Sequence, residues 1–139
     1  MTLEDRKLLL KDLSARLPYG IQAKGMYEEE VDYNIPINHN ETIIGHVDGI
    51  EHLGFDDGEV YIVIEGIPCE LSDVCIYLRP MSSMTEEEKE ELIKNFWGSH
   101  TAKDTFEELI WYLSKHFDIN ELIPKGLAIE VTKENNPYK

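Results

Sequence analysis

Residues 56–80, DDGEVYIVIEGIPCELSDVCIYLRP, decide the fold class of this chain. The Asp-Gly pair near their start suits the positive φ of a hairpin turn. The strand that follows, 59–65, is apolar on both faces. A Gly-Ile-Pro turn, a single helical turn at 70–73 and a last strand at 74–78 come next, and Pro80 ends the segment. Short strands with no long helix between them favour antiparallel pairing over a parallel α/β sheet.

The same two-residue period extends upstream of this stretch. Residues 31–37 alternate between apolar and polar positions and include a proline, which predicts a half-buried strand at an edge or a bulge. A return strand is expected at 42–47, where Gly45 and Gly49 indicate a bend or bulge. About five strands in residues 21–80, with one helical turn before the last, predict a small antiparallel sheet or an SH3-like barrel.

Helical periodicity lies on both sides of the β-rich part. An amphipathic pattern from Leu3 to Leu17, with Thr2 as its cap, predicts an N-terminal helix. Residues 85–88, TEEE, fit a capping box for a second helix. Thr105 and Glu108 fit another box, and the apolar residues from Phe106 to Phe117 keep the helical period after it.

Alternation at residues 127–131 predicts one final short strand. We therefore expect an α+β fold in one domain over residues 1–139. Its parts are an N-terminal helix at 1–20, a β-rich part at 21–80, and a helical part with a short terminal strand and tail at 81–139.

The chain is strongly acidic, with 13 Lys+Arg against 28 Asp+Glu and a formal net charge of −15. Nucleic acids and anionic membranes bind basic surfaces, so we expect neither as a direct partner. Leu, Ile, Val and Phe together make up 39 of the 139 residues, which is well above the level of about 20% at which charged chains stay disordered. The chain is therefore expected to fold.

Two acidic runs are candidates for an interaction surface. Runs of neighbouring carboxylates usually form a solvated loop or helix face, and the alternative is a surface that attracts a basic protein partner. The candidate residues are Glu28, Glu29, Glu30 and Asp32 in the first run and Glu86, Glu87, Glu90 and Glu91 in the second.

The cysteines and histidines offer only weak chemistry. Cys69 and Cys75 do not make a disulfide framework, and no signal peptide or membrane span is recognisable, so we expect a cytoplasmic protein with reduced thiols. With His46 and His52 they could in principle bind zinc, although both gaps are longer than those common in zinc sites. Ordinary surface histidines and buried thiols are the favoured interpretation.

The sequence contains no Gly-x-Ser-x-Gly elbow, Walker loop, dinucleotide fingerprint or His-Glu-x-x-His motif. We therefore expect no catalytic residue and no cofactor, and favour a non-enzymatic binding or accessory protein. Two alternatives are an inhibitor that mimics nucleic acid and occupies a host DNA- or RNA-binding protein, and a small hydrolase or metalloenzyme that uses the cysteines and histidines. Self-association would be favoured if Trp97, Trp111 and Tyr112 were exposed.

Three stretches resemble a group of uncharacterised small proteins of gut bacteria that are often encoded near prophage or other mobile-element genes. They are ARLPYG at 15–20, LRPMSSMTEEE at 78–88 and LIPKGLA at 122–128, of which the middle one is the most specific. All three lie where predicted elements join, which suits a structural role. The resemblance implies an accessory protein of a phage or mobile element, and it brings no catalytic residues with it.

Overall fold

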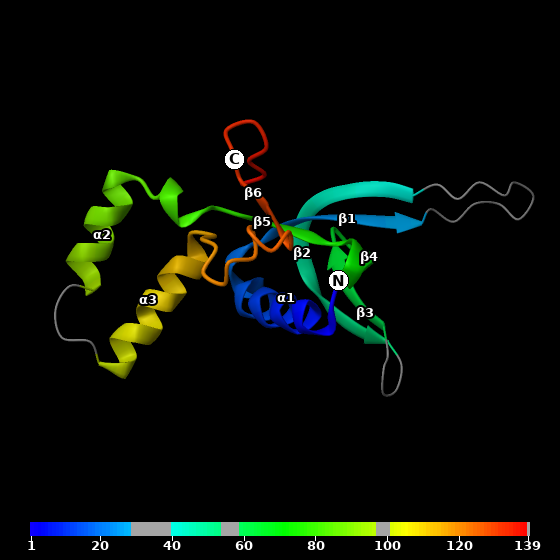
Figure 1. Cartoon of the computed structure of the whole chain (residues 1–139), viewed down its shortest axis with the longest axis horizontal. Helices are drawn as coiled ribbons and strands as arrows, with labels where there is room; N and C mark the ends of the chain where they lie inside the picture. Colours follow the sequence, from blue (N-terminus) through cyan, green and yellow to red (C-terminus); the bar gives the residue numbers. More distant parts are fainter. Residues whose placement is uncertain (29–39, 54–58, 97–100, 139) are drawn as a thin grey trace, which may run out of the picture.

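The computed structural model describes residues 1–28, 40–53, 59–96 and 101–138. It confirms the predicted α+β fold, with a helix at the start, a mostly antiparallel sheet, two further helices and a short last strand (Figure 1). In chain order the elements are α1 (Leu3–Arg16), η1 (Leu17–Tyr19), β1 (Gln22–Glu28), β2 (Asn40–Leu53), β3 (Glu59–Ile64), β4 (Ile67–Glu70), η2 (Leu71–Asp73), β5 (Cys75–Leu78), η3 (Met81–Ser83), α2 (Glu86–Phe96), α3 (Ala102–Ser114) and β6 (Ala128–Glu130).

The six strands form one sheet in the order β4-β3-β2-β1-β5-β6. Neighbouring strands are antiparallel except β5 and β6, which are parallel. The chain runs as a meander from β1 to β4, and the single turn η2 then returns it so that β5 pairs with the far side of β1. This return rolls the sheet up, because β1 contacts β4 although β3 and β2 lie between them in the strand order. We call the rolled sheet the barrel.

Gly25 marks where the rolled sheet meets itself. A Cβ at this position of β1 would lie 2.8 Å from both Cys69 Sγ of β4 and Ile64 Cδ1 of β3. Both contacts are far shorter than normal packing distances, so only glycine lets the strands approach this closely. Gly25 therefore allows β1 to pack closely against β3 and β4, and it is not part of a turn.

A second close contact fixes the bend in β2. A Cβ at Gly45 would overlap Cγ of Glu65, whose carboxylate accepts a hydrogen bond from the backbone N–H of His46 at 2.8 Å. Glu65 and Gly66 have φ of 49° and 80°, as a two-residue hairpin turn with right-handed strand twist requires. The pairing register of β2 with β3 shifts between Val47 and Gly49, which confirms the predicted bulge.

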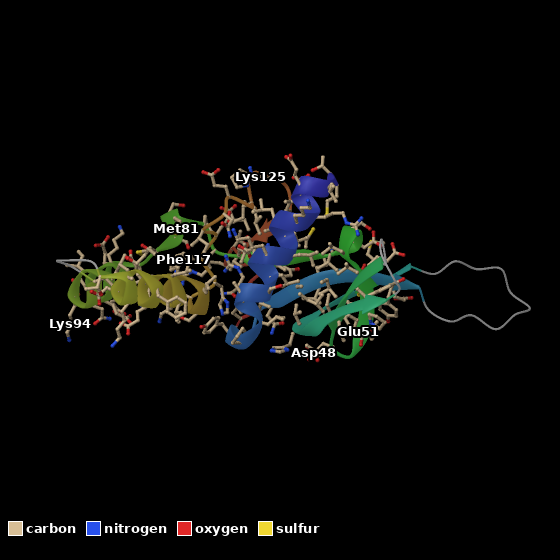
Figure 2. The ribbon with its side chains drawn as sticks, turned by 90° about the horizontal axis from the view of Figure 1, so that it is seen from below. Asp48, Glu51, Met81, Lys94, Phe117 and Lys125 are labelled. Atoms are coloured by element: carbon tan, nitrogen blue, oxygen red, sulfur yellow. The ribbon has the colours of Figure 1, made fainter. Side chains whose placement is uncertain are left out.

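Helix α1 covers the sheet and supplies Leu9 and Leu13 to the core (Figure 2). Its start has the predicted capping box between Thr2 and Asp5. The core also contains side chains from every strand except β6 and from the segment after α3. The fully or almost fully buried members are Ile21, Ala23, Val47, Val60, Ile62, Ile64, Cys69, Leu71, Val74, Ile76, Leu78, Leu122 and Leu127.

The last turn of α1 contains a fully buried ion pair. Arg16 contacts the carboxylate of Asp12 through Nε and Nη2, and the same Nη2 donates to the carbonyl of Phe117 at 2.7 Å. Asn120 Nδ2 donates to Asp12 Oδ2 at 2.7 Å. These bonds join α1 to the segment that follows α3, and they satisfy most of the polar atoms that burial removes from water.

Helices α2 and α3 extend away from the sheet as a pair (Figure 1). We call their attachment point the neck, which consists of Arg79 and residues 116–118. The N–H of Arg79 donates to the carbonyl of His116, and the N–H of Asp118 donates to the carbonyl of Arg79, both at 2.8 Å. The chain therefore leaves the barrel and returns to it at the same place.

Two sequence predictions need correction. Helix α3 begins at Ala102 rather than near Thr105, because the capping box is formed by Thr101 and Asp104 one turn earlier. Strands β1 and β4 were not predicted, since one is interrupted by small residues and the other contains Pro68, which an edge strand tolerates. The strand predicted at 31–37 and the Asp-Gly turn at 56–58 lie outside the described residues.

Candidate functional site

The outer part of the helix pair exposes apolar side chains. Along α3 the exposed fraction rises from 4% at Leu113 to 41% at Leu109 and 61% at Phe106. On α2, Ile93 is 53% exposed and no residue is buried. We call Phe106 and Leu109, which lie about one turn apart on α3, the apolar strip. A shallow hollow of about 390 Å³, between α3 and residues 119–120, borders it at Leu109.

Exposed carboxylates are numerous on the two helices. All four candidates in the second acidic run, Glu86, Glu87, Glu90 and Glu91, are exposed on α2. Glu91 accepts a hydrogen bond from Trp111 Nε1 at 3.1 Å, so it also holds the two helices together. In the first run, the side chain of Glu28 and the residues Glu29, Glu30 and Asp32 lie outside the described part.

Arg79 is the centre of the neck. Its guanidinium lies 4.3 Å from the centre of the Phe117 ring and makes two hydrogen bonds to the Glu88 carboxylate, at 2.6 and 2.8 Å. Figure 2 places Phe117 at the root of the helix pair and Lys94 toward its outer end. The hydrogen bonds from Arg79 are the main reason that the pKa of Glu88 falls from 4.5 to about 2, against the opposing effect of burial. The pair therefore stays ionised at neutral pH and ties α2 to the barrel.

A cavity of about 720 Å³ opens beside the neck. We call it the neck cavity. It is an open hollow lined by residues from 79–85, from the end of α3 and from the C-terminal segment 131–138, and its lining includes the cations Arg79, Lys115 and Lys133. None of the described residues that line it is an aspartate or a glutamate.

His116 forms part of the cavity lining, with its ring stacked on Tyr138 at a centroid distance of 3.8 Å. Burial lowers the pKa of His116 to about 4, and the positive charges of Arg16 and Arg79 lower it further in the same direction. The imidazole is thus neutral at pH 7. Its Nδ1 is buried and has no hydrogen-bond partner among the described residues.

The cysteines and histidines singled out from the sequence are spread over three strands, with both histidines in β2, Cys69 in β4 and Cys75 in β5. Cys69 is buried in β4, and Cys75 is half-buried in β5 opposite Lys24 of β1. Burial raises the pKa of both thiols, so they are protonated and weakly nucleophilic at neutral pH. His46 is exposed, 3.3 Å from Asp48, and the side chain of His52 lies outside the described part.

No group of three or more His, Cys, Asp or Glu side chains within residues 1–28, 40–53, 59–96 and 101–138 is arranged to hold a metal ion. Three aromatic residues were singled out because their exposure would favour self-association. Trp111 is only 8% exposed and stacks on Phe117, Tyr112 is half-buried, and Trp97 is not described. Phe106 is exposed, and the helical period places it on the same face as the buried Leu113.

Comparison of the chain with protein-family models, curated proteins and solved structures found no match. Among the described residues, none of the helices has both the length and the apolar composition needed to cross a bilayer.

Proposed function

We propose that the protein is a non-enzymatic accessory protein, of the phage or mobile-element type, that binds another protein through its helix pair. The observation that carries this proposal is the apolar strip, where Phe106 is 61% exposed on a helix that extends away from the core. Such side chains contribute nothing to the core, and their burial against a partner is favourable by about 1.5–3 kcal/mol for each fully buried side chain. The resemblance at 15–20, 78–88 and 122–128 supports the assignment to mobile elements.

The partner we propose is a basic amphipathic segment. Helix α2 has five glutamates and two lysines, and α3 has three acidic residues and one lysine, so carboxylates outnumber cations on the helix pair that carries the apolar strip. A partner helix with an apolar face between lysines or arginines complements both features. A second copy of the same helix pair would bring like charges together, which disfavours self-association through this surface.

The proposal is tested with three synthetic amphipathic peptides that share an apolar leucine face and carry lysine, glutamine or glutamate on the other face. Fluorescence anisotropy measures their affinity for the full-length protein at low and high salt. We expect the lysine peptide to bind most tightly and to weaken with salt, because the surrounding carboxylates contribute to attraction. The variant with Phe106→Ser and Leu109→Ser is expected to bind at least about tenfold more weakly, since two apolar contacts are lost.

The matched control is Ile44→Ser, which removes an apolar side chain of similar exposure from β2, far from the helix pair in sequence. It should leave the affinity for the lysine peptide unchanged. If it weakened binding as much as the double substitution on α3, or if neither change had an effect, the apolar strip would not be the binding surface. Light scattering of the free protein at several concentrations separates this model from self-association.

A further inference from the structure

Helix α3 carries a second stripe of side chains beside the apolar strip. Thr105, Glu108 and Tyr112 follow one another at spacings of three and four residues, so they lie on one face of the helix. Together with Leu109 and residues 119–120 they line the shallow hollow of about 390 Å³, which we call the α3 hollow. Because Leu109 belongs both to this lining and to the apolar strip, a partner that covers the strip also lies beside the hollow.

Glu108 gives the α3 hollow a negative charge. Its carboxylate accepts a hydrogen bond from the hydroxyl of Tyr112 at 3.3 Å, and within the part of the chain that the structure describes no lysine or arginine forms an ion pair with it. Burial and, next, the charge of Glu108 raise the pKa of Tyr112. Glu108 is half-buried, so its charge is less screened by water than that of an exposed carboxylate. A cation in the hollow is therefore favourable.

The lining also offers an aromatic ring, apolar surface and an amide. Tyr112 supplies the ring, and Leu109 and Ile119 supply the apolar surface. Asn120 Nδ2 donates to Asp12 Oδ2 at 2.7 Å, which orients the amide and leaves its Oδ1 as an acceptor. A side chain that matches this set has an alkyl stem and a planar cationic head with several donors, which describes arginine.

The neck shows what a ring and a carboxylate do when a guanidinium is present. There the guanidinium of Arg79 lies 4.3 Å from the centre of the Phe117 ring and makes two hydrogen bonds to the Glu88 carboxylate. The α3 hollow has a ring in Tyr112 and a carboxylate in Glu108, but no arginine among its described lining residues. It therefore contains two of the three groups of the same arrangement.

We propose that the α3 hollow receives an arginine side chain of the partner segment whose apolar face covers the apolar strip. The guanidinium pairs with Glu108 and contacts the ring of Tyr112, and the alkyl stem lies along Leu109 and Ile119. This inference rests on the proposed binding of a basic amphipathic segment, and it specifies which basic residue decides recognition. Arginine is preferred to lysine because a guanidinium can make two parallel hydrogen bonds to a carboxylate and contact a ring at the same time.

The test uses amphipathic peptides with a leucine face and with glutamine elsewhere, except at the two borders of that face. Both borders carry arginine, lysine or the neutral analogue citrulline, so either direction of the peptide along α3 presents one of them to the hollow. Fluorescence anisotropy with the full-length protein should show that the arginine peptide binds at least about fivefold more tightly than the citrulline peptide, and more tightly than the lysine peptide. The NMR spectra of the arginine and citrulline complexes should differ most at the backbone amides of Glu108, Tyr112, Ile119 and Asn120.

Glu108→Gln should remove most of the preference for arginine over citrulline and leave the affinity for the citrulline peptide unchanged. The matched control is Glu107→Gln, which makes the same change in charge at an exposed neighbour outside the lining and should keep the preference. Equal affinities of the arginine peptide and either companion, or the same loss of preference in both variants, would overturn this inference. The proposed function would still stand if the peptides bound through Phe106 and Leu109, whereas a failure of every peptide to bind would overturn both.

Discussion

Replacing Glu88 with glutamine is expected to loosen the helix pair from the barrel. The substitution removes the charge that pairs with Arg79 but keeps the shape, and glutamine can still complete the capping box with Thr85. The lowering of the Glu88 pKa from 4.5 to about 2 corresponds to about 3 kcal/mol at 1.36 kcal/mol per pH unit. Partial access of water to the pair reduces the expected loss to about 2 kcal/mol.

The sign of the pH dependence follows from the lowered pKa. The ionised carboxylate stabilises the folded state, so its contribution is fully present above pH 4.5 and is lost as the pH falls toward 2. Urea unfolding followed by circular dichroism at pH 7, and at several values between pH 5 and 2, measures the loss for the wild type and for Glu88→Gln. The variant should start about 2 kcal/mol lower and should lose less stability on acidification.

Glu87→Gln is the matched control, because this neighbour on α2 is exposed. It should change stability by less than about 0.5 kcal/mol. The reasoning would be refuted if Glu88→Gln were no less stable than Glu87→Gln at pH 7. A wild type and a Glu88→Gln variant with identical pH dependence between pH 5 and 2 would refute it as well.

Three further substitutions test other parts of the structure in urea unfolding. Gly45→Ala should cost about 1–3 kcal/mol, because its methyl group overlaps the side chain of Glu65. Asp12→Ala should cost about 3–5 kcal/mol, because it leaves Arg16 charged and fully buried. The wild type should lose about 2 kcal/mol of stability between pH 6.5 and pH 4, because the unfolded histidine takes up a proton before the folded one. His116→Asn should remove this loss. Asparagine also tolerates the φ of 65° at this position.

Each of these substitutions has its own control. Gly49→Ala should be nearly neutral, since no atom lies within 4 Å of the added Cβ, and an equal loss would contradict the overlap argument. Adding Arg16→Met to the Asp12 variant should restore part of the stability if the cost arises from the unpaired charge. His46→Asn changes an exposed histidine, and loss of the pH dependence in this variant would contradict the assignment to His116.

Much of the fold was predictable because its signals are local. The capping boxes at Thr2 and Thr85, the apolar run of β3 and the turn η2 each depend on a few neighbouring residues, and the structure confirms all four. Strand β1 was missed because its pattern is interrupted by Gly25. Glycine is required at this position because Cys69 packs directly against it. Cys69 is distant in sequence, so no local pattern could reveal the need for a glycine in this strand.

The candidate sites were less predictable, and for the same reason. Arg79 and Glu88 are near in sequence, but the contact of the Arg79 guanidinium with the Phe117 ring depends on the return of the chain after α3. The sequence did not reveal that Phe106 is exposed, because Phe106 and the buried Leu113 lie on the same face of the helix. A helical period identifies an apolar face but does not show how far along that face another element packs. The neck cavity draws residues from three separate segments, and the overall charge of −15 conceals its basic lining.

The return of the chain at the neck also has an evolutionary consequence. Residues 80–115 begin and end beside one another, since the backbone of Arg79 is hydrogen-bonded to that of His116. The barrel core and the β5–β6 pairing lie almost wholly outside this excursion. Insertions with adjacent ends are readily exchanged during evolution because the host fold need not change. The helix pair can therefore be exchanged for another insertion without a change in the barrel, which would give the same barrel a different binding specificity.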